Sequence, residues 1–398
     1  MADSVTPRPE TPGPASTPIT RRRVLGGIAG VAGLAAAPSL IAACTPAGAS
    51  TAPSASSGGA ASAPASSGAA ASSSAAAAGG EVTLGSNYSD AVPKKALADA
   101  VAKFQTDSGI NVKINTVDHN TFQDQISAYL QGTPDDVWTW FSGFRMRFFA
   151  AQGLATDISD VWSKVGDKYG EAFKVGSTGD DGKQYFIPIY LYPWAVFYRK
   201  SVFADKGYAI PKTFDELKTL AAKIQKDGLT PFAFGDKDGW PAMGTFDILN
   251  LRLNGYQFHV DLMAGKEKWT DPKVKTVFDT FKEILPFHQA GAAGRIWQDA
   301  AGALVQKKAA MYFHGMFVSQ QFQTAGQADL DDLDFFPYPD FGTQYDAEKA
   351  LDAPIDGFML SKAPKNLDGS KAFLEYLAQP ATQVAWVTAD KSNIAASK

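Results

Sequence analysis

The distribution of aromatic side chains divides this chain into two parts. All 26 Phe, 13 Tyr and 8 Trp residues lie at or after Tyr88. A segment without large apolar side chains cannot bury enough surface to offset the entropy of ordering its backbone. We therefore expect no folded domain before about residue 80, and beyond it a body long enough for two domains of roughly 150 residues each.

The first 43 residues have the features of a signal peptide. Arg21, Arg22 and Arg23 precede Val24–Ala43, a stretch without charge that is rich in Gly and Ala. A basic segment, a weakly apolar segment and small residues before Cys44 are typical of export signals, and the arginine pair indicates the twin-arginine type. We therefore predict a twin-arginine lipoprotein signal peptide over residues 1–43.

Cys44 is the only cysteine of the chain. Internal disulfides, iron–sulfur clusters and cysteine-based zinc sites are thereby excluded. The sequence Ile41-Ala42-Ala43-Cys44 resembles a lipobox, in which the cysteine becomes the first residue and carries the lipid, although Ile replaces the usual Leu. The alternative is a buried or incidental cysteine. We predict lipidation of Cys44 and attachment to the membrane.

Residues 45–80 contain only Thr, Pro, Ala, Gly and Ser. This composition predicts a disordered linker, so that residues 44–80 would tether the body to the extracytoplasmic face of the cell membrane. The whole chain has a formal net charge of −4. A mildly acidic protein is a poor partner for nucleic acid, whose binding is driven by an excess of Lys and Arg.

The body alternates between strand and helix patterns. Val82–Leu84 predicts a buried strand, and Ile110–Val117 alternates apolar and polar residues as a second strand does. Apolar residues at helical spacing lie between them and end at Gly109, a common position for a helix stop. Asp136–Trp138 begins a third strand. Strands separated by helices imply parallel β-α-β units, so we predict an α/β fold with ligands at the carboxyl ends of the strands.

The order of several motifs resembles one protein family, the family 1 extracellular solute-binding proteins. These are receptors of ABC importers that are similar to the maltose-binding protein. The resemblance covers nearly all of residues 81–398 and rests on seven motifs in the family's order: Phe104 with Gly109–Val112, Pro134-Asp135, Gly153-Leu154 with Asp157-Ile158, Asp181–Tyr185 with Pro188, Phe197–Lys200, Pro211–Leu217, and Lys308–Met311 with Gly315.

The resemblance implies a two-lobed fold with hinge crossings and a ligand cleft between the lobes. It places lobe 1 at residues 81–189 and 358–392, and lobe 2 at residues 190–357 and 393–398. Longer members continue with further helices of lobe 2, so either this sequence is truncated at Lys398 or its lobe 2 closes differently. The implied function is a monomeric receptor that binds a sugar or oligosaccharide and delivers it to the transmembrane subunits of an ABC permease.

A sugar offers flat C–H faces and a ring of hydroxyl groups. Aromatic side chains pack on the faces, and carboxylates, Arg and His bind the hydroxyls. Such residues occur here at predicted strand ends, crossings and loops, and in positions that line the cleft in the family. The predicted ligand-binding residues are Tyr88, Trp140, Arg145, Tyr192, Trp194, Trp240, His314, Phe317 and Asp356.

Several of these residues have a structural alternative. The Trp residues could belong to the core, Arg145 to the solvated surface and His314 to a buried polar contact, and Asp356 could cap a turn. The four His residues show no paired ligand spacing, so no metal site is predicted, and no cofactor is expected. A receptor for a polyamine, metal chelate or peptide remains open. An exported hydrolase with two carboxylates in the same cleft is the enzymatic alternative, but no motif supports it and we expect no enzyme.

Overall fold

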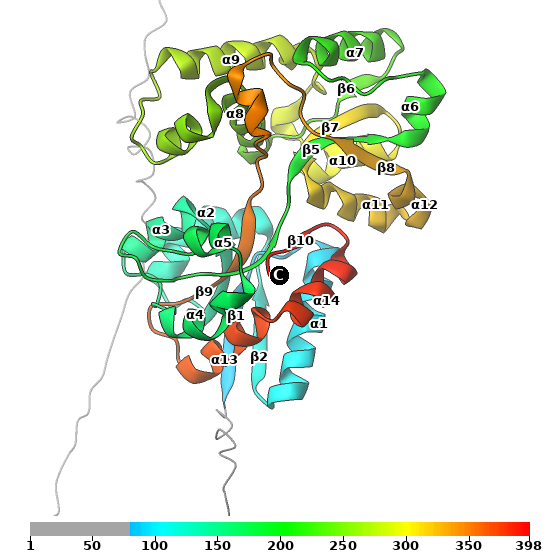
Figure 1. Ribbon diagram of the computed structural model, residues 1–398. Coiled ribbons are helices and arrows are strands. Elements are labelled where there is room, and N and C mark those ends of the chain that lie inside the picture. The colour runs from blue at the N-terminus through cyan, green and yellow to red at the C-terminus, as the bar shows by residue number, and fades with distance from the viewer. Residues whose placement is uncertain (1–79) are drawn as a thin grey trace, which may run out of the picture. The chain divides into compact units, whose positions relative to one another are not determined.

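The computed structural model describes residues 80–398. The signal peptide, Cys44 and almost all of the predicted linker lie outside the described residues. The described part is a two-lobed α/β fold with one sheet in each lobe (Figure 1). Within it, no helix combines the length and the apolar character that crossing a membrane requires.

The sheet of the first lobe has six strands in the order β10-β4-β9-β3-β1-β2. β1 runs parallel to both β2 and β3, as the alternating pattern predicts, while β9 is antiparallel to β3 and β4. The strands are β1 (Glu81–Ser86), β2 (Asn111–Thr116), β3 (Val137–Phe141), β4 (Ile187–Leu191), β9 (Ile355–Leu360) and β10 (Ile394–Ala395).

Within residues 80–398, seven α-helices accompany this sheet. α1 buries Ala96, Ala100, Val101 and Phe104 and ends at Gly109, whose left-handed backbone (φ 74°) stops the helix as its sequence position predicts. The helices are α1 (Ala91–Ser108), α2 (His119–Gln131), α3 (Phe144–Ala151), α4 (Ser159–Val165), α5 (Glu171–Gly176), α13 (Leu367–Leu377) and α14 (Pro380–Asp390).

The sheet of the second lobe has four strands in the order β6-β7-β5-β8. These are β5 (Trp194–Arg199), β6 (Thr230–Phe232), β7 (Ala309–Gly315) and β8 (Leu333–Phe336). β5 is antiparallel to β7 and β8, and β6 is parallel to β7. The helices are α6 (Lys200–Lys206), α7 (Phe214–Lys226), α8 (Trp240–Met263), α9 (Pro272–Ile284), α10 (Trp297–Val305), α11 (Ser319–Ala325) and α12 (Gln327–Asp332).

The start of α7 follows from its sequence. The Thr213 hydroxyl accepts a hydrogen bond from the Glu216 backbone N–H at 3.2 Å, and the Glu216 carboxylate accepts one from the Lys212 N–H at 2.7 Å. The carboxylate thus reaches one residue further back than in a standard capping box. Apolar residues at helical spacing bury the inner face of the helix: Leu217, Leu220, Ala221 and Ile224.

The described part of the chain passes between the lobes at two places. β4 belongs to the first sheet and β5 to the second, so residues 192–193 form one crossing. The segment that follows β8 returns to the first sheet and joins β9 at Ile355. These two segments bring side chains of both lobes close together.

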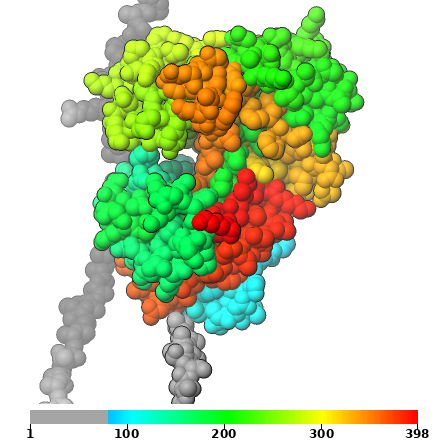
Figure 2. Space-filling view, in the orientation of Figure 1, coloured from blue at the N-terminus to red at the C-terminus, as the bar shows by residue number. Residues whose placement is uncertain are grey.

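The expected return of residues 393–398 to lobe 2 is wrong. Ile394 and Ala395 form β10 and pair with Tyr190 and Leu191 of β4 in the first sheet. The backbone N–H of Lys398 donates to the carbonyl of Lys168, so that the end of the described chain, red in Figure 2, lies against the first lobe. The free edge of β4 provides backbone groups for this pairing, which the sequence pattern of so short a strand does not reveal.

Candidate functional site

A cavity of about 340 Å³ lies between the lobes. Both lobes and the connections between them contribute to its wall, which is largely aromatic with interspersed Asp, Asn, Gln and Arg side chains. The residues treated below that line it are Asn87, Tyr88, Asp90, His119, Gln123, Phe141, Arg145, Tyr190, Tyr192, Trp194, Trp240, Gly244, Asp247, Trp297, Phe317, Asp352, Asp356 and Asn393.

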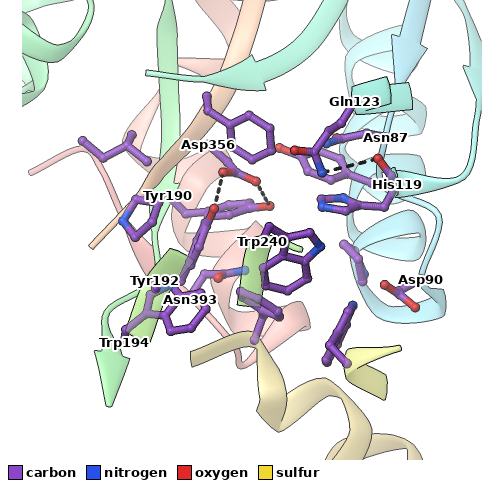
Figure 3. A pocket seen from close by; sticks show the side chains of 18 of the residues that line it. Asn87, Asp90, His119, Gln123, Tyr190, Tyr192, Trp194, Trp240, Asp356 and Asn393 are labelled. Carbon is purple, nitrogen blue, oxygen red and sulfur yellow. Dashed lines mark hydrogen bonds between the residues drawn. The ribbon is translucent and has the colours of Figure 1, made fainter. Parts of the chain in front are cut away.

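Trp240 is the central aromatic residue of this wall. It is the first residue of α8 and follows Gly239, whose φ of 77° turns the chain into the helix. Its ring stacks on His314 with 5.2 Å between centroids and an interplanar angle of 16°. Its Nε1–H donates to Oδ1 of Asn120 in the other lobe at 3.2 Å. In Figure 3 the indole lies between the tyrosines beside Asp356 and His119.

Trp194 is held at the start of β5. Its backbone N–H donates to the Asp352 carbonyl at 2.8 Å, which ties the two crossing segments together. Its ring lies edge-on to Trp240 with centroids 6.2 Å apart. A Cβ on Gly244 would come within 2.4 Å of the Trp194 ring, so the glycine allows helix α8 to pack directly against the indole.

Asp356 is a buried acid at the start of β9. It accepts hydrogen bonds from the hydroxyls of Tyr190 at 3.2 Å and Tyr192 at 3.0 Å, drawn as dashed lines in Figure 3. Burial raises the pKa of this carboxyl to about 7, and the two tyrosine hydroxyls counteract part of that rise. The same burial raises the pKa of both tyrosines, so they remain neutral donors.

Arg145 is the only Arg or Lys among the residues that line the cavity. Its Nη2 donates to Oε1 of Gln123 at 2.8 Å, and its guanidinium carbon lies 4.0 Å from the centroid of the Phe141 ring. Burial lowers the pKa of the guanidinium, while the nearby Tyr192 and Asp356 act in the opposite direction. Its position is therefore fixed by contacts within the first lobe.

Three more aspartates line the cavity. Asp90 accepts a hydrogen bond at 3.3 Å from Nε2 of Gln298, a residue of the second lobe. Burial raises the pKa of Asp247 to about 8, with a further contribution from the charge of Asp352. Burial alone raises the pKa of Asp352 to about 7. The cavity thus has far more hydrogen-bond acceptors than cations.

Most of the predicted ligand-binding residues are brought together at this cavity: Tyr88, Arg145, Tyr192, Trp194, Trp240, Phe317 and Asp356. Their contact with a ligand stays a prediction. Trp140 and His314 are not in the cavity wall, and the expectation for them is corrected.

Trp140 is part of the core of the first lobe. β3 continues to Phe141, so Trp140 lies inside the sheet rather than beyond its end. Its ring packs against Trp138 and Phe149 with centroids 5.7 and 5.5 Å away, and its Nε1–H donates to the Arg145 carbonyl at 3.2 Å.

His314 is completely enclosed by aromatic rings. Trp194, Trp297, Tyr312 and Phe317 surround it in addition to Trp240, and neither ring nitrogen has a hydrogen-bond partner among the described residues. Burial lowers its pKa to about 3, so the imidazole is neutral. It supports the aromatic wall from behind.

Other residues of the wall were not anticipated from the sequence: Asn87, Asp90, His119, Gln123, Tyr190, Asp247, Trp297, Asp352 and Asn393. One of them, Asp247, could have been recognised as a candidate from the sequence. Asp247 is a single acid in the apolar run Phe246–Leu249, where an unpaired carboxyl is rare unless it has a partner or a function. Tyr190 belongs to the aromatic run at the first crossing and could have been included on that ground.

The arrangement can bind a small polar molecule that has apolar faces. Aromatic rings offer flat surfaces, while carboxylates, amides and tyrosine hydroxyls offer hydrogen bonds in several directions. Within residues 80–398, no group of three or more His, Cys, Asp or Glu side chains is arranged to hold a metal ion.

Solved structures share this fold. The bacterial solute receptor AcbH, described as having an exclusive preference for β-D-galactopyranose, is 48% identical with a TM-score of 0.77, over 80% of this chain and 81% of that one. A chitin oligosaccharide binding protein is 24% identical with a TM-score of 0.68, over 80% and 82% of the two chains.

Relatives found by sequence are also named as solute-binding proteins. The alpha-glucosides-binding periplasmic protein AglE of Rhizobium meliloti (strain 1021) is 27% identical over 72% of this chain and 66% of its own length. An ABC transporter extracellular-binding protein of Pyrococcus horikoshii, PH1214, is 25% identical over 63% of this chain and 56% of its own. The chain therefore spans somewhat more than half of these relatives. They are named as binding proteins, in agreement with the expectation that this chain is not an enzyme.

The match to a family model extends over both lobes. Residues 85–384 match the model of the bacterial extracellular solute-binding proteins. This range includes strands of both sheets and most of the cavity wall. The chain belongs to the bacterial extracellular solute-binding protein family.

Proposed function

We propose that this protein is the sugar receptor of an ABC importer and that it holds a neutral pyranose between its two lobes. The observation that carries the proposal is the cavity itself, where indole and phenol rings from both lobes stand beside carboxyl and amide groups. A volume of about 340 Å³ is near the lower end of the range for small-molecule sites, about 300–1,000 Å³. This size favours a monosaccharide over a long oligosaccharide, and the similarity to AcbH favours galactopyranose.

Binding would act by a shift between open and closed populations. A ligand that contacts both lobes only in the closed state stabilises that state by its difference in affinity for the two. The closed protein would then be recognised by the transmembrane subunits of the permease. A lipid on Cys44 and the segment 45–80 would keep the receptor at the membrane while the lobes remain free to move.

A melting-temperature screen tests the proposed ligand class. The purified body, residues 80–398, is heated with galactose, other pyranoses, a disaccharide series and a polyamine, which is included because four aspartates line the cavity. Galactose at 100 times its dissociation constant should add about 2.7 kcal/mol to the free energy of unfolding. Stabilisation by the polyamine and by none of the sugars would contradict the proposal.

The anchor is tested separately. Cys44→Ala should move the protein from the membrane to the soluble fraction of cells that export it, because the thioether that carries the lipid cannot form. The affinity for galactose should stay the same, since all residues that line the cavity lie between Asn87 and Asn393. Cell fractionation followed by titration of the released protein measures both, and an Ala variant retained on membranes would disprove the lipid assignment.

A further inference from the structure

Two of the four aspartates in the cavity have no hydrogen-bond donor among residues 80–398. Asp356 accepts from two tyrosine hydroxyls and Asp90 accepts from Gln298. Asp247 of α8 and Asp352 of the second crossing line the same cavity, and no described residue donates a hydrogen bond to either carboxyl group. A half-buried carboxylate without a donor is destabilising, so its retention in the fold points to a donor supplied from outside.

The described residues of the cavity wall offer these two carboxyls no cationic donor. Arg145 is engaged by Gln123 and by the Phe141 ring. The charges that raise its pKa are those of Tyr192 and Asp356, and neither Asp247 nor Asp352 contributes. His119, the only His in the wall, has its pKa lowered by burial and is neutral. The side of the cavity formed by Asp247 and Asp352 is therefore acidic and without a countercharge from the wall. Asp352 also raises the pKa of Asp247 by its charge, which indicates that the two carboxyls are close.

We propose that Asp247 and Asp352 accept hydrogen bonds from hydroxyl groups of the bound pyranose and thereby exclude acidic sugars, such as uronic acids and sugar phosphates, from the site. This inference rests on the proposed sugar-receptor function and adds to it the class of sugar. An uncharged hydroxyl satisfies the open acceptors, whereas a carboxylate or phosphate group adds a like charge in a poorly solvated space.

The test uses D-galactose and D-galacturonic acid, which differ at C6 in a hydroxymethyl or a carboxylate. We expect wild-type protein to bind galacturonate at least about 100-fold more weakly than galactose in calorimetric titrations at pH 9, where both carboxyls are ionised. Asp247→Asn and Asp352→Asn keep the side-chain size but lose the charged acceptor. Each should weaken galactose binding roughly 10- to 100-fold, and the double variant should reduce the discrimination against galacturonate.

Melting of the empty protein provides a second readout that separates a ligand contact from a structural role. Each Asn variant should melt at the same temperature as wild type or higher at pH 9, where both carboxyls are ionised, because it removes a buried charge that nothing in the fold compensates. Asp167→Asn is the matched control, since the Asp167 side chain is 83% exposed and does not line the cavity. It should change neither the melting temperature nor the affinity.

The outcomes are distinct. If wild type binds galactose and both single variants bind it equally well, or if the variants melt markedly lower, the assignment of Asp247 and Asp352 is wrong while the receptor function stands. If galacturonate binds wild type as tightly as galactose, the exclusion of acidic sugars is wrong. If wild type binds no pyranose at all, both the function and this inference fail.

Discussion

Replacement of Trp240 by alanine is expected to weaken galactose binding about 100-fold. The indole is the central ring of the cavity wall, and covering an aromatic face of this size contributes about 2 kcal/mol. The variant also loses the hydrogen bond at 3.2 Å to Asn120 across the cleft, which contributes about 1 kcal/mol. Together they correspond to roughly two orders of magnitude in the dissociation constant, measured by calorimetric titration.

Two further variants show which part of Trp240 is responsible. Trp240→Phe keeps a ring face but has no N–H for Asn120, so its affinity should fall between those of wild type and Trp240→Ala. Trp269→Ala removes an indole of the same lobe that is 55% exposed and is not part of the cavity wall. It should bind galactose as wild type does. Equal affinities for wild type and Trp240→Ala would disprove the role of Trp240.

The empty protein is expected to lose about 5 °C or more in melting temperature between pH 6.5 and pH 8.5. Buried carboxyls cause this loss: burial raises the pKa of Asp247 to about 8 and those of Asp352 and Asp356 to about 7. In this range the unfolded chain has released these protons and the folded protein still holds some. Stability therefore falls as the pH rises, by an estimated 2–4 kcal/mol, and a chain of this size changes its melting temperature by roughly 2 °C per kcal/mol.

The chosen pH range separates this effect from others. Burial lowers the pKa of His259 and His288 to about 4 and of His314 to about 3, and these groups add stability as the pH rises. Most of their contribution arises below about pH 6.5, the value of an unfolded histidine, so they oppose the carboxyl effect only weakly within the chosen range. Surface aspartates with lowered pKa, such as Asp118, act below about pH 4. Scanning fluorimetry at constant ionic strength measures the profile. It should flatten in the Asp247→Asn/Asp352→Asn double variant, and a flat or rising wild-type profile would contradict the raised pKa values.

The fold class was predictable because it depends on patterns that are local in sequence. The strands at Val82–Leu84 and Ile110–Val117, the stop at Gly109 and the cap at Thr213 each follow from a few adjacent residues, and the structure has an element at each of them. The pairing of Ile394 and Ala395 with β4 was not predictable in this way. Two residues carry no periodicity, and their partner is about 200 positions away in the chain.

The site was predictable to the extent that it follows the crossings. Tyr192, Trp194 and Asp356 lie where the chain passes between the lobes, so their place in the cavity wall follows from the topology. The predictions for Trp140 and His314 failed because the period of a strand gives the face on which a side chain lies. It does not give the residue at which the strand ends or the elements that cover that face. Asp247 was missed because its role depends on which side of α8 faces the cleft, a property of packing between elements.

Hydrogen bonds that join the lobes without a ligand also affect the rates at which the protein binds and releases its ligand. Trp240 to Asn120, Gln298 to Asp90 and Ser319 to Ser392, the last at 3.0 Å, all form between groups of the protein itself. They favour closure of the empty protein, and an empty molecule that is closed cannot admit a solute. The association rate is thus reduced by the fraction of molecules that are closed, while the same bonds delay release. Two receptors with equal equilibrium affinity can therefore differ in their exchange times, and hydrogen bonds of this kind contribute to that difference.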